Sequence, residues 1–358
     1  MTNILVTGGA GFIGTNFVYY WLDKYPADNI IVLDALTYAG IRGNLPETTV
    51  KTDNKYPGFQ FVHGNILDQN LVEKLLTQYN INTIVHFAAE SHVDRSITGP
   101  DEFINTNIVG THTLLKAAKK IWLDKNSFDH HFHHISTDEV YGTLKPDDPL
   151  FSETTPYAPN SPYAASKASS DHLVRAYHET YGLKTTTSNC SNNFGPFQFP
   201  EKLIPLVITN ILDGKPIPVY GDGMQIRDWL HVDDHNKGVD LILQKGKSGQ
   251  TYNIGNHNEK TNMDIVKTIC KLMDKKFGYN NGAMVKRFPK APKAGGKSSE
   301  TLITHVKDRL GHDRRYAIDP EKIKSELGYF PEKTFETGIE QTINWFVDNE
   351  KWWRRIIK

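Results

Sequence analysis

The sequence predicts an α/β protein in which a doubly wound parallel sheet is followed by a smaller C-terminal α/β lobe. Short β-rich apolar runs alternate with segments of helical periodicity through the first half of the chain, as is typical of a parallel sheet covered by helices on both faces. The first run ends in closely spaced glycines that open a helical segment. After residue 190, proline and glycine interrupt the pattern and the alternation weakens.

The individual elements follow from hydrophobic periodicity. Strands are predicted at residues 4–7, 30–34, 59–62 and 83–87 and in the run that ends at Thr137, and helices at 16–22, 71–76, 163–177, 235–243, 263–273 and 335–346. Residues 279–299 are rich in glycine, lysine, asparagine and proline, which predicts an exposed loop. Residues 1–190, with a returning segment near 228–256, are expected to form the first domain, and 191–358 the smaller lobe interleaved with it.

Charge and composition exclude several classes of function. The 358 residues include 41 Lys and Arg and 41 Asp and Glu, so no global field attracts nucleic acid or anionic lipid, and an anionic ligand needs a local basic cluster. No apolar run is long enough to cross a bilayer and no segment resembles a leader peptide, which predicts a cytoplasmic protein. Cys190 and Cys270 have no metal-binding spacing and are expected to be free, buried thiols in reducing surroundings.

Three glycines after the first strand predict a dinucleotide-binding turn. Gly8 permits a tight turn, Gly11 lets the backbone approach a pyrophosphate, and Gly14 lets the helix pack closely on the sheet. The helix N-terminus then offers unpaired N–H groups to the phosphates. Asp34 ends the second strand, where its carboxylate would accept hydrogen bonds from ribose hydroxyls and repel the additional phosphate of NADP. The sequence therefore predicts a Rossmann-type sheet that binds NAD.

Tyr163 and Lys167 lie four residues apart on one face of a predicted helix. A phenol is a poor base near neutral pH, but an ammonium one turn away is expected to lower the pKa of the phenol and so produce a base for an alcohol proton. Such a pair alone usually belongs to a solvated helix face, whereas behind a dinucleotide turn it indicates hydride transfer. Ser136 and Thr137 would add hydroxyls at the carboxyl end of a strand, where open α/β sheets bind ligands.

Asp138 and Glu139 follow Thr137 directly. An acidic pair after a strand often only caps the next helix. Beside a group that oxidises an alcohol to a ketone, however, the neighbouring C–H becomes acidic, and two carboxyl groups with different pKa values could remove this proton and protonate a departing hydroxyl. From these residues alone, both capping and elimination of water remain open.

The turn Gly8-x-x-Gly11-x-x-Gly14 together with Tyr163-x-x-x-Lys167 resembles the extended short-chain dehydrogenase/reductase superfamily. Within it, nearly the full chain resembles the nucleoside-diphosphate-sugar 4,6-dehydratases. The matching stretches are residues 6–15, 33–40, 86–97, 135–142, 161–174, 188–205, 220–235 and 311–319. Epimerases of this superfamily share the glycines and the Tyr/Lys pair, but typically lack the Asp-Glu pair that this chain has.

This resemblance implies a three-step reaction on a nucleotide sugar, with dTDP-glucose favoured. Tyr163 would take the C4 hydroxyl proton as a hydride passes from C4 to NAD, while Thr137 hydrogen-bonds the C4 oxygen. Glu139 as base and Asp138 as acid would then eliminate water across C5 and C6. The hydride would return to C6 while Glu139 reprotonates C5, which gives a 4-keto-6-deoxy sugar. Because no net oxidation occurs, NAD is expected to remain bound through many turnovers.

The resemblance also implies binding residues. Those for NAD are Gly8, Gly11, Phe12, Ile13, Gly14, Asp34, Thr37, Asn65, Ile66, Ala88, Ala89, Ser91, Asn107, Tyr163, Lys167 and Asn192. Those for the substrate are Ser91, His92, Arg95, Asn192, Glu201, Lys202, Leu203, Pro218, Tyr220, Arg227, Asn262, Arg309, His312 and Tyr316. Arg227 is the first candidate for clamping the diphosphate, and the rings of Tyr220 and Tyr316 are candidates for stacking on the base or sugar.

The resemblance extends to assembly, with two departures from the family pattern. Helices spanning 107–118 and 164–181 resemble those of a four-helix dimer core, which predicts a homodimer. Leu310 replaces a proline common in the family, and the segment 279–299 looks longer than in relatives. Both departures lie near the expected nucleotide site, so the base preference is less firmly predicted than the reaction.

Four alternatives were weighed against this prediction: a 4,6-dehydratase for another nucleoside-diphosphate hexose, a nucleotide-sugar 4-epimerase, a decarboxylase and a non-catalytic NAD-binding protein. The Asp138/Glu139 pair argues against the epimerase and the decarboxylase, and the intact Tyr163/Lys167 pair against the non-catalytic protein. The histidines of residues 130–134 are not expected to hold a metal, because neighbours in a strand point to opposite faces and no nearby cysteine or carboxylate completes a ligand set.

Overall fold

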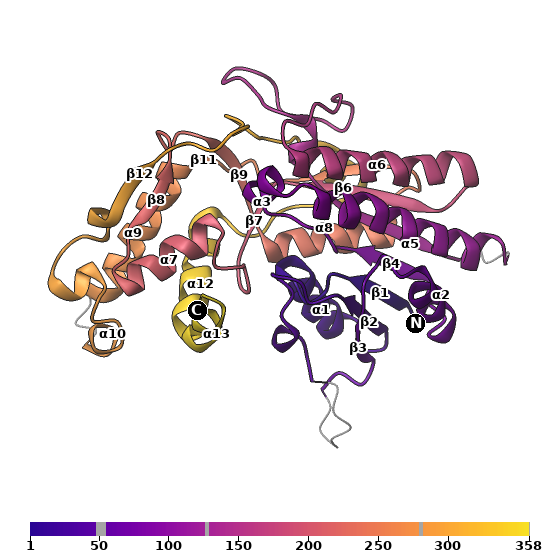
Figure 1. The fold of residues 1–358 in the computed structure, drawn as a ribbon, viewed down its shortest axis with the longest axis horizontal. Coiled ribbons are helices and arrows are strands. Elements are labelled where there is room, and N and C mark those ends of the chain that lie inside the picture. The colour runs from indigo at the N-terminus through magenta and orange to yellow at the C-terminus, as the bar shows by residue number, and fades with distance from the viewer. Residues whose placement is uncertain (48–54, 126–128, 279–281, 358) are drawn as a thin grey trace.

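The computed structural model describes residues 1–47, 55–125, 129–278 and 282–357. Within these ranges the largest layer is a seven-stranded parallel sheet in the order β3-β2-β1-β4-β5-β6-β10 (Figure 1). Its strands are β1 (Asn3–Thr7), β2 (Asn29–Asp34), β3 (Phe59–His63), β4 (Thr83–His86), β5 (His131–Thr137), β6 (Thr185–Cys190) and β10 (Thr251–Ile254). The predicted doubly wound parallel sheet is therefore confirmed.

Helices cover both faces of this sheet. One face carries α1 (Phe12–Lys24), α8 (Val232–Lys245) and α11 (Glu321–Leu327), and the other carries α2 (Gln69–Gln78), α5 (Thr111–Ala118) and α6 (Pro162–Tyr181). Shorter helical segments in this half are η1 (Arg42–Asn44), α3 (Val93–Thr98), α4 (Asp101–Phe103), η2 (Ile104–Gly110), η3 (Lys119–Leu123) and η4 (Asp138–Tyr141). Because both faces are covered, the central strands read as nearly continuous apolar runs: Ile30, Ile31, Val32 and Leu33 of β2 are all buried.

Local sequence signals explain the boundaries of α6, the helix that carries the Tyr/Lys pair. Ser161 caps its N-terminus, since Oγ accepts a hydrogen bond from the N–H of Ala164 at 3.0 Å. Pro162 follows in the first turn, where its missing N–H costs nothing. Gly182 ends the helix in the left-handed conformation, with φ of 74°. The start of α6, and with it the position of Tyr163, is therefore set by the local sequence.

The smaller lobe lies beside the carboxyl edge of the sheet (Figure 1). Its described strands are β7 (Asn192–Phe194), β9 (Ile226–His231) and β11 (Glu259–Thr261) in one sheet, and β8 (Ile217–Tyr220) and β12 (Ile303–Val306) in another. Its described helices are α7 (Leu203–Asp213), α9 (Asn262–Gly278), α10 (Gly282–Arg287), η5 (Pro292–Gly295), η6 (Ser299–Leu302), α12 (Phe335–Asp348) and α13 (Glu350–Ile356). They enclose a separate apolar core that includes Ile208, Ile269, Met273, Phe346 and Trp353.

The chain passes from the sheet into the smaller lobe and back. β10 pairs in parallel with β6, with Thr251 opposite Thr187, although β10 follows β7, β8 and β9 in the sequence. α8, which lies between β9 and β10, packs on the same face of the sheet as α1. The smaller lobe is thereby connected to the sheet at several points around the carboxyl edge, where the site lies.

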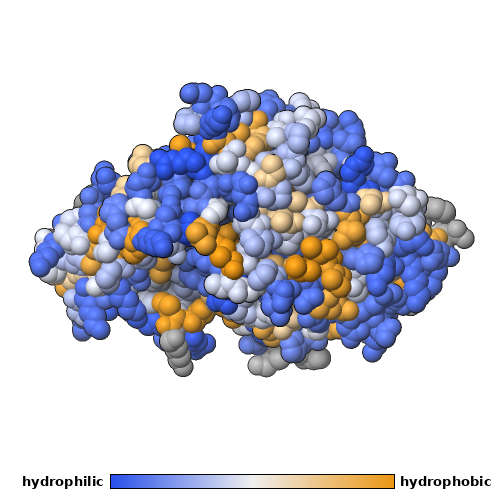
Figure 2. Space-filling view, turned by 45° about the horizontal axis from the view of Figure 1, so that its top comes forward, coloured by the Kyte–Doolittle hydropathy of each residue, from blue (hydrophilic) through white to orange (hydrophobic). Residues whose placement is uncertain are grey.

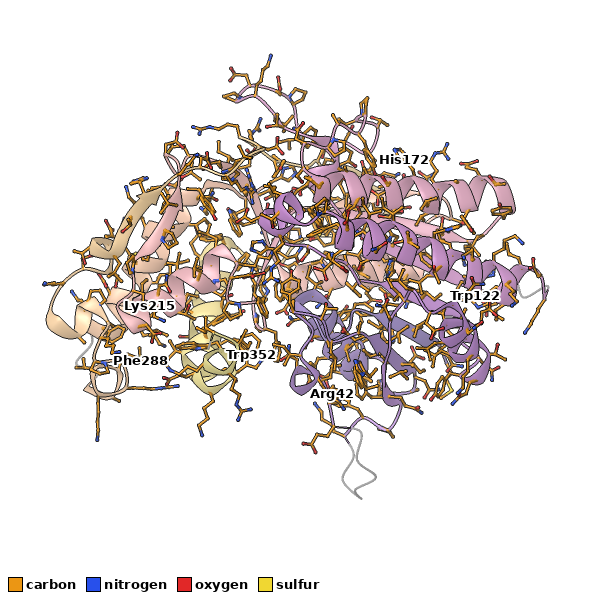
Figure 3. All side chains as sticks on the ribbon, viewed as in Figure 1. Arg42, Trp122, His172, Lys215, Phe288 and Trp352 are labelled. Atoms are coloured by element: carbon orange, nitrogen blue, oxygen red, sulfur yellow. The ribbon has the colours of Figure 1, made fainter. Side chains whose placement is uncertain are left out.

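The prediction of an exposed loop over 279–299 is wrong for the described part of that segment, while 279–281 lie outside the described residues. α10 and η5 occupy it, and Met284, Phe288 and Ala291 are at most 6% exposed in the core of the smaller lobe (Figure 3 labels Phe288). These three residues recur at helical spacing and face the core, whereas Val285 of the same segment is 37% exposed. The polar composition concealed this pattern.

Both cysteines are buried free thiols, as predicted from their spacing. Among the helices that the structure describes, none combines the length and the apolar character needed to cross a bilayer.

Candidate active site

A cavity of about 320 Å³ opens at the carboxyl ends of the parallel strands. It lies where the strand order reverses between β1 and β4, the place where open α/β sheets bind ligands. The segments that follow β1, β2, β4, β5 and β6 all contribute to its wall, together with the start of α6. The predicted nucleotide turn and the predicted catalytic groups thus share one cavity.

The glycine turn has the geometry of a dinucleotide cradle. Gly8 has φ of 71°, and a Cβ there would lie 2.5 Å from the backbone nitrogen of Ala88, so a side chain is excluded. A Cβ on Gly14 would lie 2.4 Å from the carbonyl oxygen of Gly8, which lets α1 pack close to the turn. At Gly11 a Cβ would meet, among described atoms, one carbonyl oxygen at 3.3 Å, and no described side chain caps the α1 N-terminus. The first N–H groups of α1 are therefore available to a phosphate.

Asp34 stands at the carboxyl end of β2, as predicted. Its Oδ2 accepts from the N–H of Ala10 at 2.9 Å and its Oδ1 from the N–H of Leu36 at 2.8 Å, which fixes the carboxylate in the cavity wall. Burial raises its pKa, and the two backbone donors oppose this shift. The glycine cradle and this carboxylate together fit the pyrophosphate and ribose of NAD.

The predicted NAD-binding residues come together in this cavity, with one difference. Those that line it are Gly8, Gly11, Phe12, Ile13, Gly14, Asp34, Thr37, Asn65, Ile66, Ala88, Ala89, Ser91, Tyr163, Lys167 and Asn192. Asn107 is not among the described lining residues, because it lies behind the wall. Its amide binds both backbone groups of Glu90, at 2.9 and 3.0 Å, and the hydroxyl of Ser166 at 2.8 Å, so Asn107 supports the segment after β4.

Tyr163 and Lys167 are both buried in the wall. Lys167 Nζ donates to the carbonyl oxygen of Ile135 on β5 at 2.8 Å. The expected net decrease in the pKa of Tyr163 is wrong for this structure, because burial, and then the Glu139 carboxylate, raise this pKa well above its usual value. Burial also lowers the pKa of Lys167 to about 8.

Asp138 and Glu139 are distinguished by their surroundings. Burial, and next the charge of Glu139, raise the pKa of Asp138 well above its usual value, which favours its protonated form. Burial also raises the pKa of Glu139, but Arg309, Arg227 and Lys202 oppose that shift and favour its carboxylate. Two carboxyl groups whose surroundings push their pKa values apart are suited to act as an acid and a base.

The geometry does not support the alternative that Asp138 and Glu139 only cap the next helix. The short helix η4 begins at Asp138, and its cap is Thr137, whose Oγ1 accepts from the N–H of Glu139 at 3.3 Å. Asp138 Oδ2 is buried without a hydrogen-bond partner in the described part of the chain. An unpartnered buried carboxyl oxygen at a cavity wall costs stability unless a ligand satisfies it, which favours a functional position for Asp138.

Asp138→Asn is expected to stabilise the fold, increasingly so as the pH rises. The folded pKa of Asp138 is raised, so its destabilising effect is absent below the unfolded pKa and grows as the pH rises toward the folded pKa. Each unit by which the pKa is raised is worth about 1.4 kcal/mol at the alkaline end. Thermal denaturation between pH 4 and pH 9 measures this, and a Tm difference between variant and wild type that is constant with pH would contradict the burial argument.

The smaller lobe brings three cations toward Glu139: Lys202, Arg227 and Arg309. Arg227 is buried, with its guanidinium 4.2 Å from the ring centre of Tyr316, and it donates to the carbonyl oxygens of Ile226 and Asp313 at 2.7 and 3.0 Å. Lys202 lines the cavity and donates to the carbonyl oxygen of Ser91 at 3.1 Å. Arg227 is therefore held rigidly, and the ring of Tyr316 is buried against it rather than open to a ligand.

Asp94 of α3 bridges to the smaller lobe. Its carboxylate accepts from the hydroxyl of Tyr220 at 3.0 Å and from the guanidinium of Arg309 at 3.4 Å. Nε of Arg309 is buried and has no hydrogen-bond partner in the described part of the chain. Tyr220 and Arg309, two of the predicted substrate residues, thus bind the carboxylate of Asp94. A substrate diphosphate would have to replace this carboxylate.

The other predicted substrate residues lie at several depths. Ser91 and Asn192 line the cavity, and Oδ1 of Asn192 is buried without a described partner. Around its mouth, Glu201 contacts Arg95 at 3.2 Å and His92 at 3.6 Å, and His312 lies 2.6 Å from Asp308. Leu203, Pro218 and Asn262 begin or continue α7, β8 and α9 and are not among the described lining residues. Leu310 is 74% exposed.

Several lining residues were not predicted as contacts. They include Tyr38, Glu90, Gln198 and Phe199, and the rings of Tyr38 and Phe199 lie 5.6 Å apart at one side of the cavity. Tyr38 and residues 198–199 lie inside stretches that match the family, so the resemblance could have indicated them. Their residue types alone did not suggest a binding or catalytic role. Asp171 was also missed, although its position four residues after Lys167 is visible in the sequence.

The histidines of β5 have partners within the sheet. His131 Nε2 and His133 Nδ1 lie 2.7 and 2.8 Å from the hydroxyl of Thr186. The expectation that no carboxylate is nearby is wrong, because Oδ1 of Asp171 lies 3.1 Å from Nε2 of His134. This carboxylate comes from α6, 37 positions along the chain, so local sequence could not reveal it.

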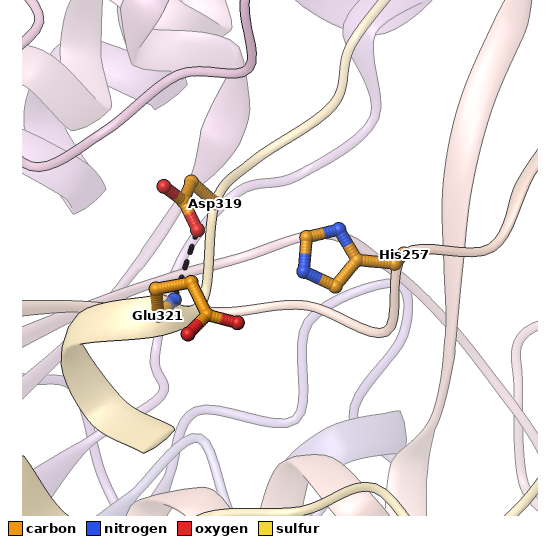
Figure 4. Close-up of side chains that lie close together, drawn as sticks. All are labelled: His257, Asp319 and Glu321. Carbon is orange, nitrogen blue, oxygen red and sulfur yellow. Dashed lines mark hydrogen bonds between the residues drawn. The ribbon is translucent and has the colours of Figure 1, made fainter. Parts of the chain in front are cut away.

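One group of metal-ligand types lies away from the cavity among the described residues: His257, Asp319 and Glu321 (Figure 4). Asp319 Oδ1 accepts from the N–H of Glu321 at 2.9 Å and so stabilises the start of α11. Glu321 Oε1 accepts from Lys324 at 2.9 Å. Helix stabilisation and an ion pair account for both carboxylates, and we assign no metal to this group.

Comparisons with known proteins agree with this site. The family model described as GDP-mannose 4,6 dehydratase matches residues 5–342. A dTDP-glucose 4,6-dehydratase of Neisseria meningitidis is 52% identical over 360 residues, covering 100% of this chain and 96% of the relative. The crystal structure of a dTDP-glucose 4,6-dehydratase from Streptomyces venezuelae, with NAD bound, is 44% identical with a TM-score of 0.86, covering 99% of this chain and 100% of that one.

An epimerase is more distant. The structure of a UDP-glucose 4-epimerase from Thermotoga maritima has a TM-score of 0.80 but is 26% identical, covering 98% of this chain and 100% of that one. The epimerase shares the fold, whereas the dehydratases share half of the sequence as well. The chain therefore belongs to the dTDP-glucose 4,6-dehydratase family.

Proposed function

We propose that this protein is an NAD-dependent dTDP-glucose 4,6-dehydratase, a hydro-lyase that produces dTDP-4-keto-6-deoxy-D-glucose. The observation that carries the proposal is the pair Asp138 and Glu139, which line the cavity that also holds Tyr163 and Lys167 and whose surroundings differ: three cations oppose the raised pKa of Glu139, whereas the charge of Glu139 adds to the raised pKa of Asp138. Relatives about half identical over the whole chain bear this name, and the 26% identity of the epimerase makes epimerisation the weaker alternative.

The proposed mechanism assigns a separate task to each side chain. The glycine turn and Asp34 would hold NAD, which would supply a reversible hydride acceptor for C4 and C6. Tyr163 takes the proton of the C4 hydroxyl, with Thr137 beside it as hydrogen-bond partner. Glu139, where three cations oppose the increase in pKa caused by burial, removes the C5 proton, while Asp138 in its protonated form protonates the departing C6 hydroxyl. Glu139 then returns a proton to C5 when the hydride reaches C6.

The binding roles belong to the same proposal. The residues that line the glycine side of the cavity hold NAD, and Lys202, Arg227 and Arg309 attract the diphosphate of the sugar nucleotide. The division into a nucleotide domain at 1–190, with the returning segment near 228–256, and a sugar-nucleotide lobe at 191–358 follows from these roles. We also propose a cytoplasmic location, which the two free cysteines favour.

Purified protein mixed with dTDP-glucose tests the function. The expected result is the ultraviolet chromophore that a 4-keto-6-deoxy sugar develops in alkali, with no added NAD needed for continued turnover. The UDP-, CDP- and GDP-hexoses tested in parallel measure the base preference. Conversion to a C4 epimer without the chromophore would replace the proposal by its alternative.

We further propose a homodimer through the helices of residues 107–118 and 164–181. Apolar side chains are exposed on these segments and directly before the first: Ile104 at 48% and Val109 at 43% on η2, and Tyr181 at 48% at the end of α6. Figure 2 turns this helical side of the molecule forward and shows apolar groups (orange) among hydrophilic ones. Light scattering at micromolar concentration should give twice the mass of 40.6 kDa, and Ile104→Lys/Val109→Lys should give the monomer mass. A wild-type monomer would contradict the dimer.

A further inference from the structure

We propose that Asp171 is a positioning residue whose carboxylate is the internal counter-ion that keeps Lys167 charged and seated against β5. This inference rests on the proposed function and extends it, because Asp171 lies behind the cavity wall formed by Lys167 and none of the steps above uses it. The argument begins from the placement of the two side chains and then considers their charges.

Asp171 and Lys167 lie one turn apart on α6, and both are buried, at 5% and 4% exposure. They attach to consecutive residues of the neighbouring strand. Lys167 Nζ donates to the carbonyl oxygen of Ile135 at 2.8 Å, and Asp171 Oδ2 accepts from the hydroxyl of Ser136 at 2.9 Å. Both side chains are therefore fastened to the end of β5, immediately before Thr137.

The remaining contacts of Asp171 supply no full charge. Tyr157 donates its hydroxyl to Oδ2 at 3.0 Å, and His134 of β5 places Nε2 3.1 Å from Oδ1 without hydrogen-bond geometry. Burial holds the pKa of His134 well below its usual value, so this ring is neutral at neutral pH. His172 on α6 is exposed (Figure 3). Lys167, one turn away on the same helix, is thus the buried cation whose charge acts on the Asp171 carboxylate, without a direct ion pair between them.

The groups around Lys167 show which charges act on its ammonium. Burial raises the pKa of the Cys190 thiol on β6 to about 12, so this group is neutral. His86 on β4 and His134 on β5 are neutral for the same reason, because burial holds the pKa of each well below its usual value. Among the charges that act on Lys167 within the described residues, the Asp171 carboxylate is therefore the one that favours the ammonium.

Burial and the counter-ion act on Lys167 in opposite directions. Burial lowers the pKa of Lys167 to about 8, and Asp171 is the first group that opposes this decrease. Burial raises the pKa of Asp171 to about 6, and Lys167 is the first group that opposes that increase. Both groups are ionised between these two values. Removal of Asp171 would therefore lower the pKa of Lys167 further and shift this side chain toward its neutral form, which stabilises the Tyr163 phenolate less.

The test compares the neutral variants Asp171→Asn and Asp171→Ser with Asp171→Glu, which keeps the charge. In protein labelled with ¹³C-lysine, and with the resonance assigned through Lys167→Met, the titration of Lys167 is expected near pH 8 in wild type. It should fall by about one unit or more in both neutral variants and return toward the wild-type value in Asp171→Glu. Glu179→Gln removes an exposed carboxylate of the same helix and should change nothing.

Turnover provides the second measurement. The alkaline limb of the pH profile of kcat should move to lower pH in Asp171→Asn, so that the loss is about tenfold larger at pH 8 than at pH 6. In a Lys167→Met background, Asp171→Asn should have no further effect on the residual rate. A Lys167 pKa that is equal in wild type and both neutral variants, or a loss of rate uniform across pH, would overturn the proposal. The titration requires no turnover, so failure of the proposed function would leave it measurable.

Discussion

Tyr163→Phe is expected to lower kcat for dTDP-glucose by about 10²–10⁴-fold, while bound NAD is retained. The substitution keeps the ring that fills the buried wall and removes the hydroxyl, the atom that would take the C4 proton. Because the proposed reaction begins with this proton transfer, no later step can compensate. Initial rates from the alkaline chromophore, together with NAD released on denaturation, measure both quantities.

Tyr177→Phe is the matched control, because it removes a hydroxyl from another buried tyrosine of the same helix. Its kcat should remain within about twofold of wild type, since surface and packing changes of this size are small. A Tyr163→Phe enzyme with near-normal kcat would show that another base acts at C4.

The double variant Asp138→Asn/Glu139→Gln should form keto-deoxy product at least about 10³ times more slowly than wild type. Both carboxyl groups needed for elimination are then neutral amides, whereas Tyr163 and the cofactor cradle are intact. Oxidation at C4 should therefore still occur and then stop. The expected signature is near-ultraviolet absorbance of reduced nicotinamide that rises on mixing with dTDP-glucose and persists.

Asp147→Asn, in the exposed loop after η4, is the control for removal of an acidic group near the site and should keep the wild-type rate. Full turnover in the double variant would remove Asp138 and Glu139 from the mechanism. Loss of both product and reduced nicotinamide would show that the pair is needed before elimination, at binding or at the first oxidation.

The family features that could be predicted from the sequence are those whose geometry is local. The glycine turn depends on a few consecutive residues between a strand and a helix, and a helix places residues four apart on one face, so the positions of Gly8–Gly14 and of Tyr163 with Lys167 followed from spacing. Asp138 and Glu139 stood out at the end of a predicted strand, but only the family resemblance favoured elimination of water over helix capping. Composition was the less reliable guide, as the buried residues Met284, Phe288 and Ala291 show.

Electrostatics were decided by the tertiary structure. Three cations converge on Glu139 from the smaller lobe, and Asp171 comes under the end of β5, because packing of the lobe and of α6 brings together residues far apart in the chain. The pKa of Tyr163 is raised where the spacing alone predicted a decrease. The spacing shows that a lysine lies one turn away, but it does not show how deeply the phenol is buried in the folded chain. The sequence by itself determined which groups can carry the chemistry, and burial in the folded chain decided their protonation states.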